Sequence, residues 1–217
     1  MGGIRLYDYA ASGNCYKVRL LLANLGREYE RVPVDIFDAD TLSDEYAEKN
    51  PAREVPVLEL PDGRYITQSG AILMYLAEGT DLWPDDPFDR AQVLRWLLYE
   101  QTDVVPATGG LRFRLITGRL EPDSPGAQQR RQAGEQVVSL LDAHLATQPF
   151  FAAGRYTIAD IAIYSYVHVA GEAGYDLSAY PNIGAWLERV AHQPGYMNDL
   201  VPYPPNASEL AGRSIYG

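Results

Sequence analysis

Strand-like segments occur only in the first third of this 217-residue chain. Short runs rich in β-prone side chains occupy residues 4–9, 29–36 and 55–60, and a Pro-Asp-Gly turn joins the last run to a further strand. Residues 16–25 place apolar side chains at the spacing of an amphipathic helix, a polar and weakly helical segment follows the second strand, and another helix begins at Ser69. These segments predict an α/β domain with the order βαβαββα.

The rest of the chain predicts helices alone. The stretch Leu82–Phe88 is acidic and rich in proline, which is typical of a connection between domains. Hydrophobic periodicity predicts helices at roughly 89–118, 125–147, 157–172 and 183–193, followed by a coil rich in proline and glycine. We therefore expect an α/β domain at 1–80, a linker at 81–89 and an all-α helical-bundle domain at 90–217.

The composition is that of a soluble globular protein, with 47% hydrophobic and 22% charged residues. No segment approaches the roughly 18 consecutive apolar residues of a membrane span, and the N-terminus lacks the apolar stretch of a signal peptide. A single cysteine excludes an internal disulfide framework and suits a reducing compartment. We expect a cytoplasmic protein with no membrane partner.

The ionisable residues indicate which partners and ligands the protein can bind. With 29 acidic and 18 basic residues the net charge is −11, and a field of that sign repels the phosphate backbone of nucleic acids. We therefore expect no nucleic-acid partner. The three histidines (His144, His168 and His192) are far apart without a second ligand nearby, so no metal site is predicted.

The segment Tyr156-Thr-Ile-Ala-Asp160 has a clear helix-start signature. Thr157 is placed as the N-cap, and Asp160 lies three residues later, where its carboxylate reaches back to the Thr157 amide. We interpret Asp160 as a structural residue.

Four stretches match one family in order and spacing. They are "SGNCYKVRL" after the first strand, "NPAREVPVL" (50–58), "QSGAILMYLAE" (68–78) and "YTIADIAIY" (156–164). With these stretches the chain resembles the cytosolic glutathione S-transferase family, in particular its bacterial members. The resemblance implies a thioredoxin-like first domain, glutathione as co-substrate, a small hydrophobic electrophile as second substrate, a homodimer, and no metal.

The resemblance also implies where glutathione binds. Val55 precedes Pro56 in what resembles the family's Val-cis-Pro, whose exposed main-chain groups pair with the cysteinyl part of glutathione; the alternative is an ordinary trans-proline that opens a strand. Ser69 begins a helix, where free N–H groups and the helix dipole favour the γ-glutamyl carboxylate. Gln68, where many members have an acid, supplies no charge to the ligand's amine, and Asp103 is the candidate to supply it across a dimer interface.

Arg53 is the candidate partner of the glycyl carboxylate. Many members have a basic residue directly before Val-Pro, whereas this chain has Glu54 there and the basic residue one place earlier. The alternative is that Arg53 is a solvated surface charge.

The thiol-activating group is expected in the turn that begins the first helix. Ser12 aligns with the catalytic serine of theta- and zeta-like classes, Cys15 with the catalytic cysteine of the beta class, and Asn14 with an asparagine that some bacterial members use. A helix N-terminus and hydrogen bonds to the charged form both lower the pKa of a thiol. We favour Ser12 as the donor to the glutathione sulfur, assisted by Asn14; Cys15 remains the alternative and would imply mixed-disulfide chemistry.

The electrophile site is expected between the domains. Tyr99, Arg112 and Phe113 on the first long helix are candidates to line it, and Tyr9 is a candidate for packing against it more than for catalysis. For an arginine at this place the alternative is a salt bridge at the surface or at a dimer interface. The predicted activity is that of a glutathione transferase. A glutathione-dependent disulfide reductase or peroxidase, and a non-catalytic binding or scaffold protein with the same fold, are the alternatives.

Overall fold

The computed structural model describes residues 3–205, and every strand that it describes lies before residue 68. This part contains β1 (Arg5–Asp8), α1 (Gly13–Asn24), β2 (Glu30–Pro33), a 3-10 turn η1 (Asp40–Leu42), α2 (Asp44–Lys49), β3 (Val57–Glu59), β4 (Tyr65–Thr67) and α3 (Ser69–Ala77). The predicted order βαβαββα and the thioredoxin-like first domain are confirmed.

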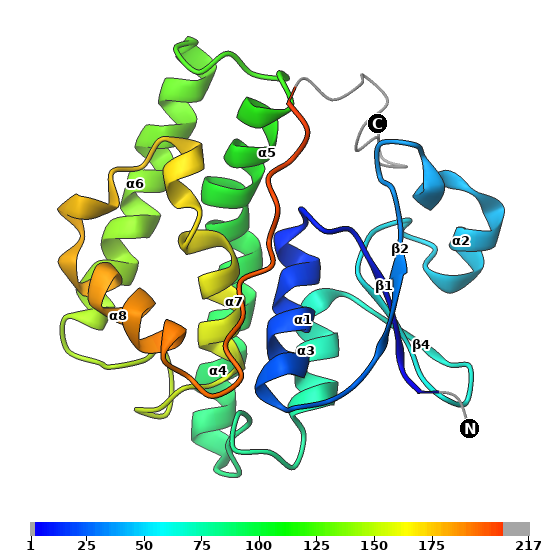
Figure 1. Cartoon of the computed structure of the whole chain (residues 1–217). Coiled ribbons are helices and arrows are strands. Elements are labelled where there is room, and N and C mark those ends of the chain that lie inside the picture. Colours follow the sequence, from blue (N-terminus) through cyan, green and yellow to red (C-terminus); the bar gives the residue numbers. More distant parts are fainter. Residues whose placement is uncertain (1–2, 206–217) are drawn as a thin grey trace.

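The four strands form one mixed sheet in the order β2-β1-β3-β4. β1 is parallel to β2 and antiparallel to β3, with Leu6 opposite Leu58, and β3 pairs with β4 as a hairpin. Because both Leu6 and Leu58 are fully buried, this register turns one face of the sheet into the core. Helices α1 and α3 cover that face, and α2 lies on the side of the sheet away from the helical part (Figure 1).

The second part is helical, as predicted. It contains α4 (Pro87–Tyr99), the π-helical segment η2 (Glu100–Gly109), α5 (Gly110–Ile116), α6 (Pro125–Leu145), α7 (Ile158–Val167), two 3-10 turns η3 (Ala170–Ala173) and η4 (Leu177–Ala179), and α8 (Pro181–Ala191). α4, η2 and α5 follow one another without a break, so the long helix expected at 89–118 is present from 87 to 116. Its middle is wound more widely than expected, and Pro106 lies inside that stretch.

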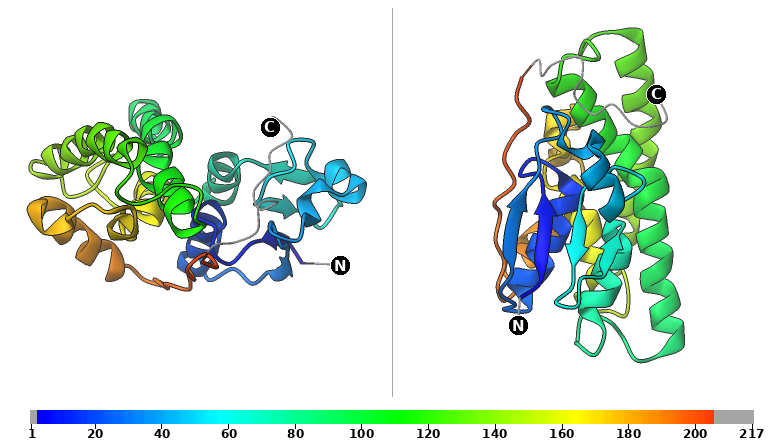
Figure 2. Two further views of the ribbon diagram at one scale, coloured as in Figure 1. Left: turned by 90° about the horizontal axis from the view of Figure 1, so that it is seen from above. Right: turned by 90° about the vertical axis from the view of Figure 1, so that its right-hand side faces the viewer.

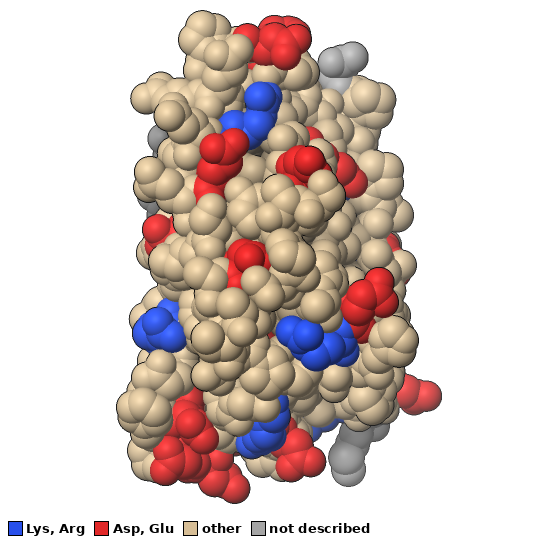
Figure 3. All heavy atoms as spheres, turned by 90° about the vertical axis from the view of Figure 1, so that its left-hand side faces the viewer, with Lys and Arg blue, Asp and Glu red and all other residues tan. Residues whose placement is uncertain are grey.

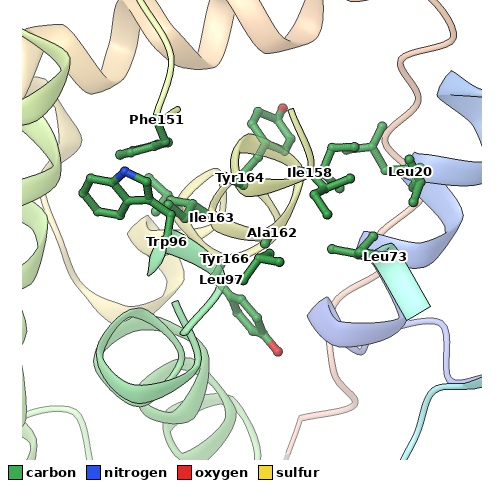
Figure 4. Packing of buried hydrophobic residues seen from close by; sticks show 14 of the residues in the cluster. Leu20, Leu73, Trp96, Leu97, Phe151, Ile158, Ala162, Ile163, Tyr164 and Tyr166 are labelled. Atoms are coloured by element: carbon green, nitrogen blue, oxygen red, sulfur yellow. The ribbon is translucent and has the colours of Figure 1, made fainter. Parts of the chain in front are cut away.

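Helix α7 lies at the centre of the molecule. All ten of its residues are buried, and side chains of α1, α3 and α4 surround it (Figure 4). The predicted capping box is present: the main-chain N–H of Thr157 donates to Oδ2 of Asp160 (3.0 Å), and the Thr157 hydroxyl accepts from the N–H of Ala159 (3.3 Å). Asp160 is fully buried, which supports its structural interpretation.

The two parts lie side by side, and the segment after α8 runs along their junction (Figures 1 and 2). Tyr16 on α1 donates a hydrogen bond to the carbonyl of Met197 (2.8 Å), and Arg19 pairs with Asp199 (2.9 Å), so this segment is fastened to α1. The tail expected from 201 onward lies mostly outside the described residues. No helix of the described part is long and apolar enough to cross a membrane.

Acidic and basic side chains are interspersed on the face that α6 and α8 help to form (Figure 3). Lys and Arg stand there as separate groups among Asp and Glu, so this face of residues 3–205 presents no continuous basic surface.

Candidate functional site

The turn between β1 and α1 places Ser12 and Asn14 at a helix start. Ser12 is the N-cap residue of α1: its backbone is extended and its Oγ accepts a hydrogen bond from the N–H of Cys15 (3.3 Å). This bond uses Ser12 as an acceptor, so its hydroxyl proton remains available for donation. Ser12 is nearly buried, whereas Asn14 is partly exposed.

Two buried arginines hold this turn. Arg19 donates to the carbonyl of Ala10 (3.1 Å), and Arg112 donates to the carbonyl of Ala11 (3.4 Å). Arg112 is only 2% exposed and its Nε lies 2.6 Å from Glu172. Of the two roles expected for Arg112, the structure shows a salt bridge, although inside the protein: its guanidinium pairs with Glu172 and supports the turn before Ser12.

A cavity opens between the two domains in front of this turn. Its volume is about 560 Å³, within the roughly 300–1,000 Å³ of small-molecule sites. Five predicted site residues line it, namely Asn14, Arg53, Val55, Gln68 and Phe113. The other lining residues are Ile36, Thr41, Ala52, Glu54, Gln101 and Val105. The cavity thus brings together residues that are distant in the sequence and belong to both domains.

The wall at Val55 offers free main-chain groups. The predicted cis peptide bond between Val55 and Pro56 is present. Among residues 3–205, neither the N–H nor the carbonyl of Val55 has a hydrogen-bond partner, although Val55 lies only two residues before β3. An extended peptide can pair with such groups.

The side chain of Asn14 has a fixed orientation. Its Oδ1 accepts hydrogen bonds from the ammonium of Lys17 (2.8 Å) and from the hydroxyl of Ser69 (3.2 Å). An ammonium group only donates, so the oxygen of the amide must face Lys17. No partner for the Asn14 NH₂ group is found in the described part of the chain, and Asn14 lines the cavity.

Lys17 and Glu100 were not identified from the sequence. The Lys17 ammonium lies 2.7 Å from Oε1 of Glu100, and both side chains are 1% exposed. Burial lowers the pKa of Lys17 and raises the pKa of Glu100, and the attraction within the pair opposes both shifts. Because the partners lie in different domains, no local pattern revealed them.

Ser69 and Gln68 lie where α3 begins. Ser69 is the first residue of α3 and is buried, and Gln68 precedes it with a positive φ of 68°. Nε2 of Gln68 donates to Oε2 of Glu54 (3.2 Å). The carboxylate of Glu54 therefore lies on the cavity wall beside Gln68, a charge that the sequence did not place there.

Arg53 lines the cavity, but its donors are engaged. The guanidinium contacts the carbonyls of Leu42 and Ser43 and the carboxylate of Asp44. In this arrangement Arg53 fastens the loop before α2 to the edge of the cavity.

Cys15 is fully buried, and its sulfur accepts a hydrogen bond from the N–H of Tyr9 (3.4 Å). Burial raises the pKa of this thiol to about 12, and the negative charge of Asp8 contributes to the same increase. A buried, protonated thiol is a poor nucleophile, so the position of Cys15 argues against its use as the reacting group.

The remaining predicted residues divide into two sets. The Tyr9 ring belongs to an aromatic cluster with Phe37, Phe113 and Tyr203, whose ring centroids lie 5.1 to 6.4 Å apart. Tyr99 instead packs edge-on against Trp96 (5.6 Å), and neither Tyr99 nor Asp103 lines the cavity. Within residues 3–205, no group of His, Cys, Asp or Glu is arranged to hold a metal ion.

Comparison with known proteins gives matches over both parts of the chain. The family model of the glutathione S-transferase N-terminal domain matches residues 2–78, and that of the C-terminal domain matches residues 96–194. Maleylacetoacetate isomerase of Rhizobium meliloti is 34% identical over 194 residues, which cover 86% of this chain and 90% of the isomerase.

Solved structures of glutathione transferases also match this chain over most of its length. A glutathione S-transferase from Pseudomonas fluorescens has a TM-score of 0.87 and 39% identity, covering 91% of this chain and 99% of that one. A glutathione transferase from Pseudomonas putida, with one glutathione disulfide bound per subunit, has a TM-score of 0.80 and 27% identity, covering 91% and 90%. With two matching domains, a 34% identical relative and solved structures of the same fold, the chain belongs to the glutathione S-transferase family.

Proposed function

We propose that this protein is a glutathione transferase that binds glutathione in the interdomain cavity and activates its thiol for attack on a small electrophile. One observation carries the proposal: the amide of Asn14 and the free main-chain groups of Val55 face the same cavity. An extended tripeptide that pairs with Val55 would bring its cysteinyl sulfur toward the start of α1.

The two ends of glutathione have candidate partners on the same wall. The main-chain N–H groups at the start of α3 suit the γ-glutamyl carboxylate. Glu54, beside Gln68, supplies a negative charge for the ligand's amine. Arg53 suits the glycyl carboxylate if its guanidinium releases the carbonyls that it now contacts.

The thiol would release its proton to solvent water at the N-terminus of α1, where the resulting thiolate is stabilised. The Asn14 NH₂ group and the Ser12 hydroxyl are donors, and the helix dipole favours negative charge there. Lowering the pKa of a thiol from about 8.5 by roughly two units makes thiolate dominant at pH 7 and corresponds to about 2.7 kcal/mol. The thiolate then forms a carbon–sulfur bond with the electrophile as the leaving group departs with the electron pair.

The second substrate would enter from the side of the cavity formed by Val105 and Phe113. We propose a homodimer because large apolar side chains are exposed on two neighbouring helices: Phe88, Leu94 and Leu98 on α4, and Tyr75 on α3. In such a dimer Asp103, which lies outside the cavity of its own chain, is the residue that we propose to face the ligand of the other copy.

The proposal is tested by calorimetry and by turnover. The wild-type protein should release or absorb heat with glutathione, show thiolate absorbance, and convert an aryl halide. Asn14→Ala and Ser12→Ala should each reduce thiolate formation and turnover, by about tenfold to a hundredfold if the group donates to the sulfur. Absence of heat and of a thermal shift at millimolar glutathione would reject the proposal and favour a scaffold protein.

A disulfide reductase is the second candidate because the similar Pseudomonas putida transferase was solved with glutathione disulfide. Activity toward a mixed disulfide or a hydroperoxide that exceeds aryl transfer would favour it. Since Cys15 is buried, that reaction would use the thiol of bound glutathione rather than a cysteine of the chain.

A further inference from the structure

Lys17 lies beneath the candidate site as a fully buried cation. Its ammonium is 2.8 Å from Oδ1 of Asn14, 3.3 Å from Oγ of Ser69 and 2.7 Å from Oε1 of Glu100. These oxygens belong to α1, α3 and η2: the ammonium donates hydrogen bonds to Asn14 and Ser69 and forms a salt bridge with Glu100. The ring of Tyr166 covers the ammonium at 5.0 Å.

The charge of Lys17 decides which atom of Asn14 faces the cavity. A protonated amine has no acceptor, so the amide oxygen must turn inward and the NH₂ group is left on the cavity side. A neutral amine has a lone pair and would accept a hydrogen bond from the amide NH₂ equally well. The amide would then be free to rotate and present its oxygen, which repels a thiolate.

Glu100 keeps Lys17 charged. Burial alone favours the neutral amine, and the carboxylate of Glu100 is the acidic side chain in contact with the ammonium within residues 3–205. Glu100 begins the π-helical segment, whose Gln101 and Val105 line the cavity. Wide helical turns of this kind are often found at functional sites.

We propose that the buried pair of Lys17 and Glu100 positions the Asn14 amide for thiol activation, so that docking of the helical domain completes the site in the thioredoxin-like domain. Lys17 and Glu100 are positioning residues: they act through Asn14 and contact neither substrate. The inference rests on the proposed function, because it requires that glutathione thiolate form at Asn14.

The test uses variants that avoid an unpaired buried charge. Lys17→Met alone would leave the Glu100 carboxylate buried without a partner, which is strongly destabilising. The double variant Lys17→Met/Glu100→Gln removes both charges and keeps similar volumes. Glu100→Gln alone is nearly isosteric and serves if the double variant does not fold, because without the carboxylate burial favours the neutral amine of Lys17. Asp142→Asn is the control. Asp142 also lies in the helical domain, where its Oδ1 accepts hydrogen bonds from the main-chain N–H groups of Asn182 and Ile183 at the start of α8.

Thiolate absorbance of the glutathione complex is followed against pH, and turnover of an aryl halide is measured at saturating glutathione. In the double variant the pKa of the bound thiol should rise by about one unit and kcat should fall about tenfold. Asp142→Asn should leave the thiol pKa unchanged even if it lowers the melting temperature.

A double-mutant cycle distinguishes positioning from general damage. If Lys17 and Glu100 act through Asn14, adding the double change to Asn14→Ala should lower kcat less than about twofold further. The inference would be overturned, with the proposed function intact, if the losses of kcat in Asn14→Ala and in the double variant multiplied when combined. It would also be overturned if the thiol pKa in the double variant equalled that of the wild type. A wild-type protein that forms no thiolate would overturn both.

Discussion

The indole Nε1 of Trp186 donates a 3.0 Å hydrogen bond to Oδ1 of Asp160, and this bond joins α8 to the first turn of α7. Both side chains are fully buried. The same carboxylate accepts the main-chain N–H groups of Phe151 and Thr157, each at 3.0 Å. One side chain therefore satisfies three buried N–H donors of the helical domain, and it also accepts a hydrogen bond from the Thr157 hydroxyl (3.3 Å).

Replacing this carboxylate should be costly. In Asp160→Ala the three donors remain buried without an acceptor, and each such loss costs about 1–3 kcal/mol, so we expect the free energy of unfolding to fall by at least about 3 kcal/mol. Chemical denaturation measures it. Asp160→Asn keeps one oxygen and should lose clearly less; equal losses in the two variants would contradict this account.

Close packing at the domain junction gives a second prediction. A Cβ atom added to Gly13 would lie 2.6 Å from Cε1 of Tyr166, and one added to Gly109 would lie 2.3 Å from the same ring atom. Tyr166 is thus held between the start of α1 and the end of η2. Because the ring has no room to move, Gly13→Ala should destabilise the protein by about 1–3 kcal/mol, measured by urea unfolding.

Gly184→Ala is the matched control for Gly13→Ala. Gly184 lies inside α8, and nothing is within 4 Å of its added Cβ. Alanine should stabilise that helix by roughly 0.5–1 kcal/mol. A loss of stability at Gly184 similar to that at Gly13 would show that the Tyr166 contact is not the cause.

The thiol of Cys15 gives a prediction about pH. Since burial raises its pKa to about 12, Cys15 stays protonated in the folded protein throughout neutral and mildly alkaline pH. Alkylation by iodoacetamide at mildly alkaline pH should therefore be very slow in the native protein and fast once denaturant exposes the thiol. Rapid alkylation of the native protein with a midpoint near neutral pH would show a reactive cysteine and revive the mixed-disulfide alternative.

The fold was predictable because local patterns determine it. Alternating and helical periodicity located the strands and helices, and the capping box marked the start of α7 at Thr157. The resemblance named Asn14 and Val55 as site residues, and both line one cavity because β1 and β3 are antiparallel, so that the end of β1 and the beginning of β3 lie at the same end of the sheet.

The charges of the site were not predictable in the same way. A lysine in the second turn of a helix usually reaches solvent, yet Lys17 is buried because Glu100, 83 positions later, meets it across the domain junction. The sequence left open whether Arg112 lines the electrophile site or forms a salt bridge, and its partner Glu172 lies 60 positions later. The π-helical segment η2, which begins at Glu100, was not predicted from the sequence either.

The C-terminal segment gives the last prediction. The ring of Tyr203 stacks on Tyr9 (6.1 Å), meets Phe113 edge-on (5.1 Å), and receives the guanidinium of Arg112 at 4.8 Å. Tyr203 therefore fixes the position of Phe113, which lines the cavity on the side proposed for the electrophile.

Tyr203→Ala removes aromatic contacts of about 0.5–1.5 kcal/mol each, so we expect the KM for an aryl electrophile to rise about three- to tenfold. The KM for glutathione should stay unchanged, because Val55 and Gln68, which also line the cavity, have no contact with Tyr203. Tyr203→Phe keeps the ring and should behave as the wild type in steady-state kinetics. If Tyr203→Phe raises the electrophile KM as much as Tyr203→Ala, or if the KM for glutathione rises in parallel, the ring does not act through Phe113.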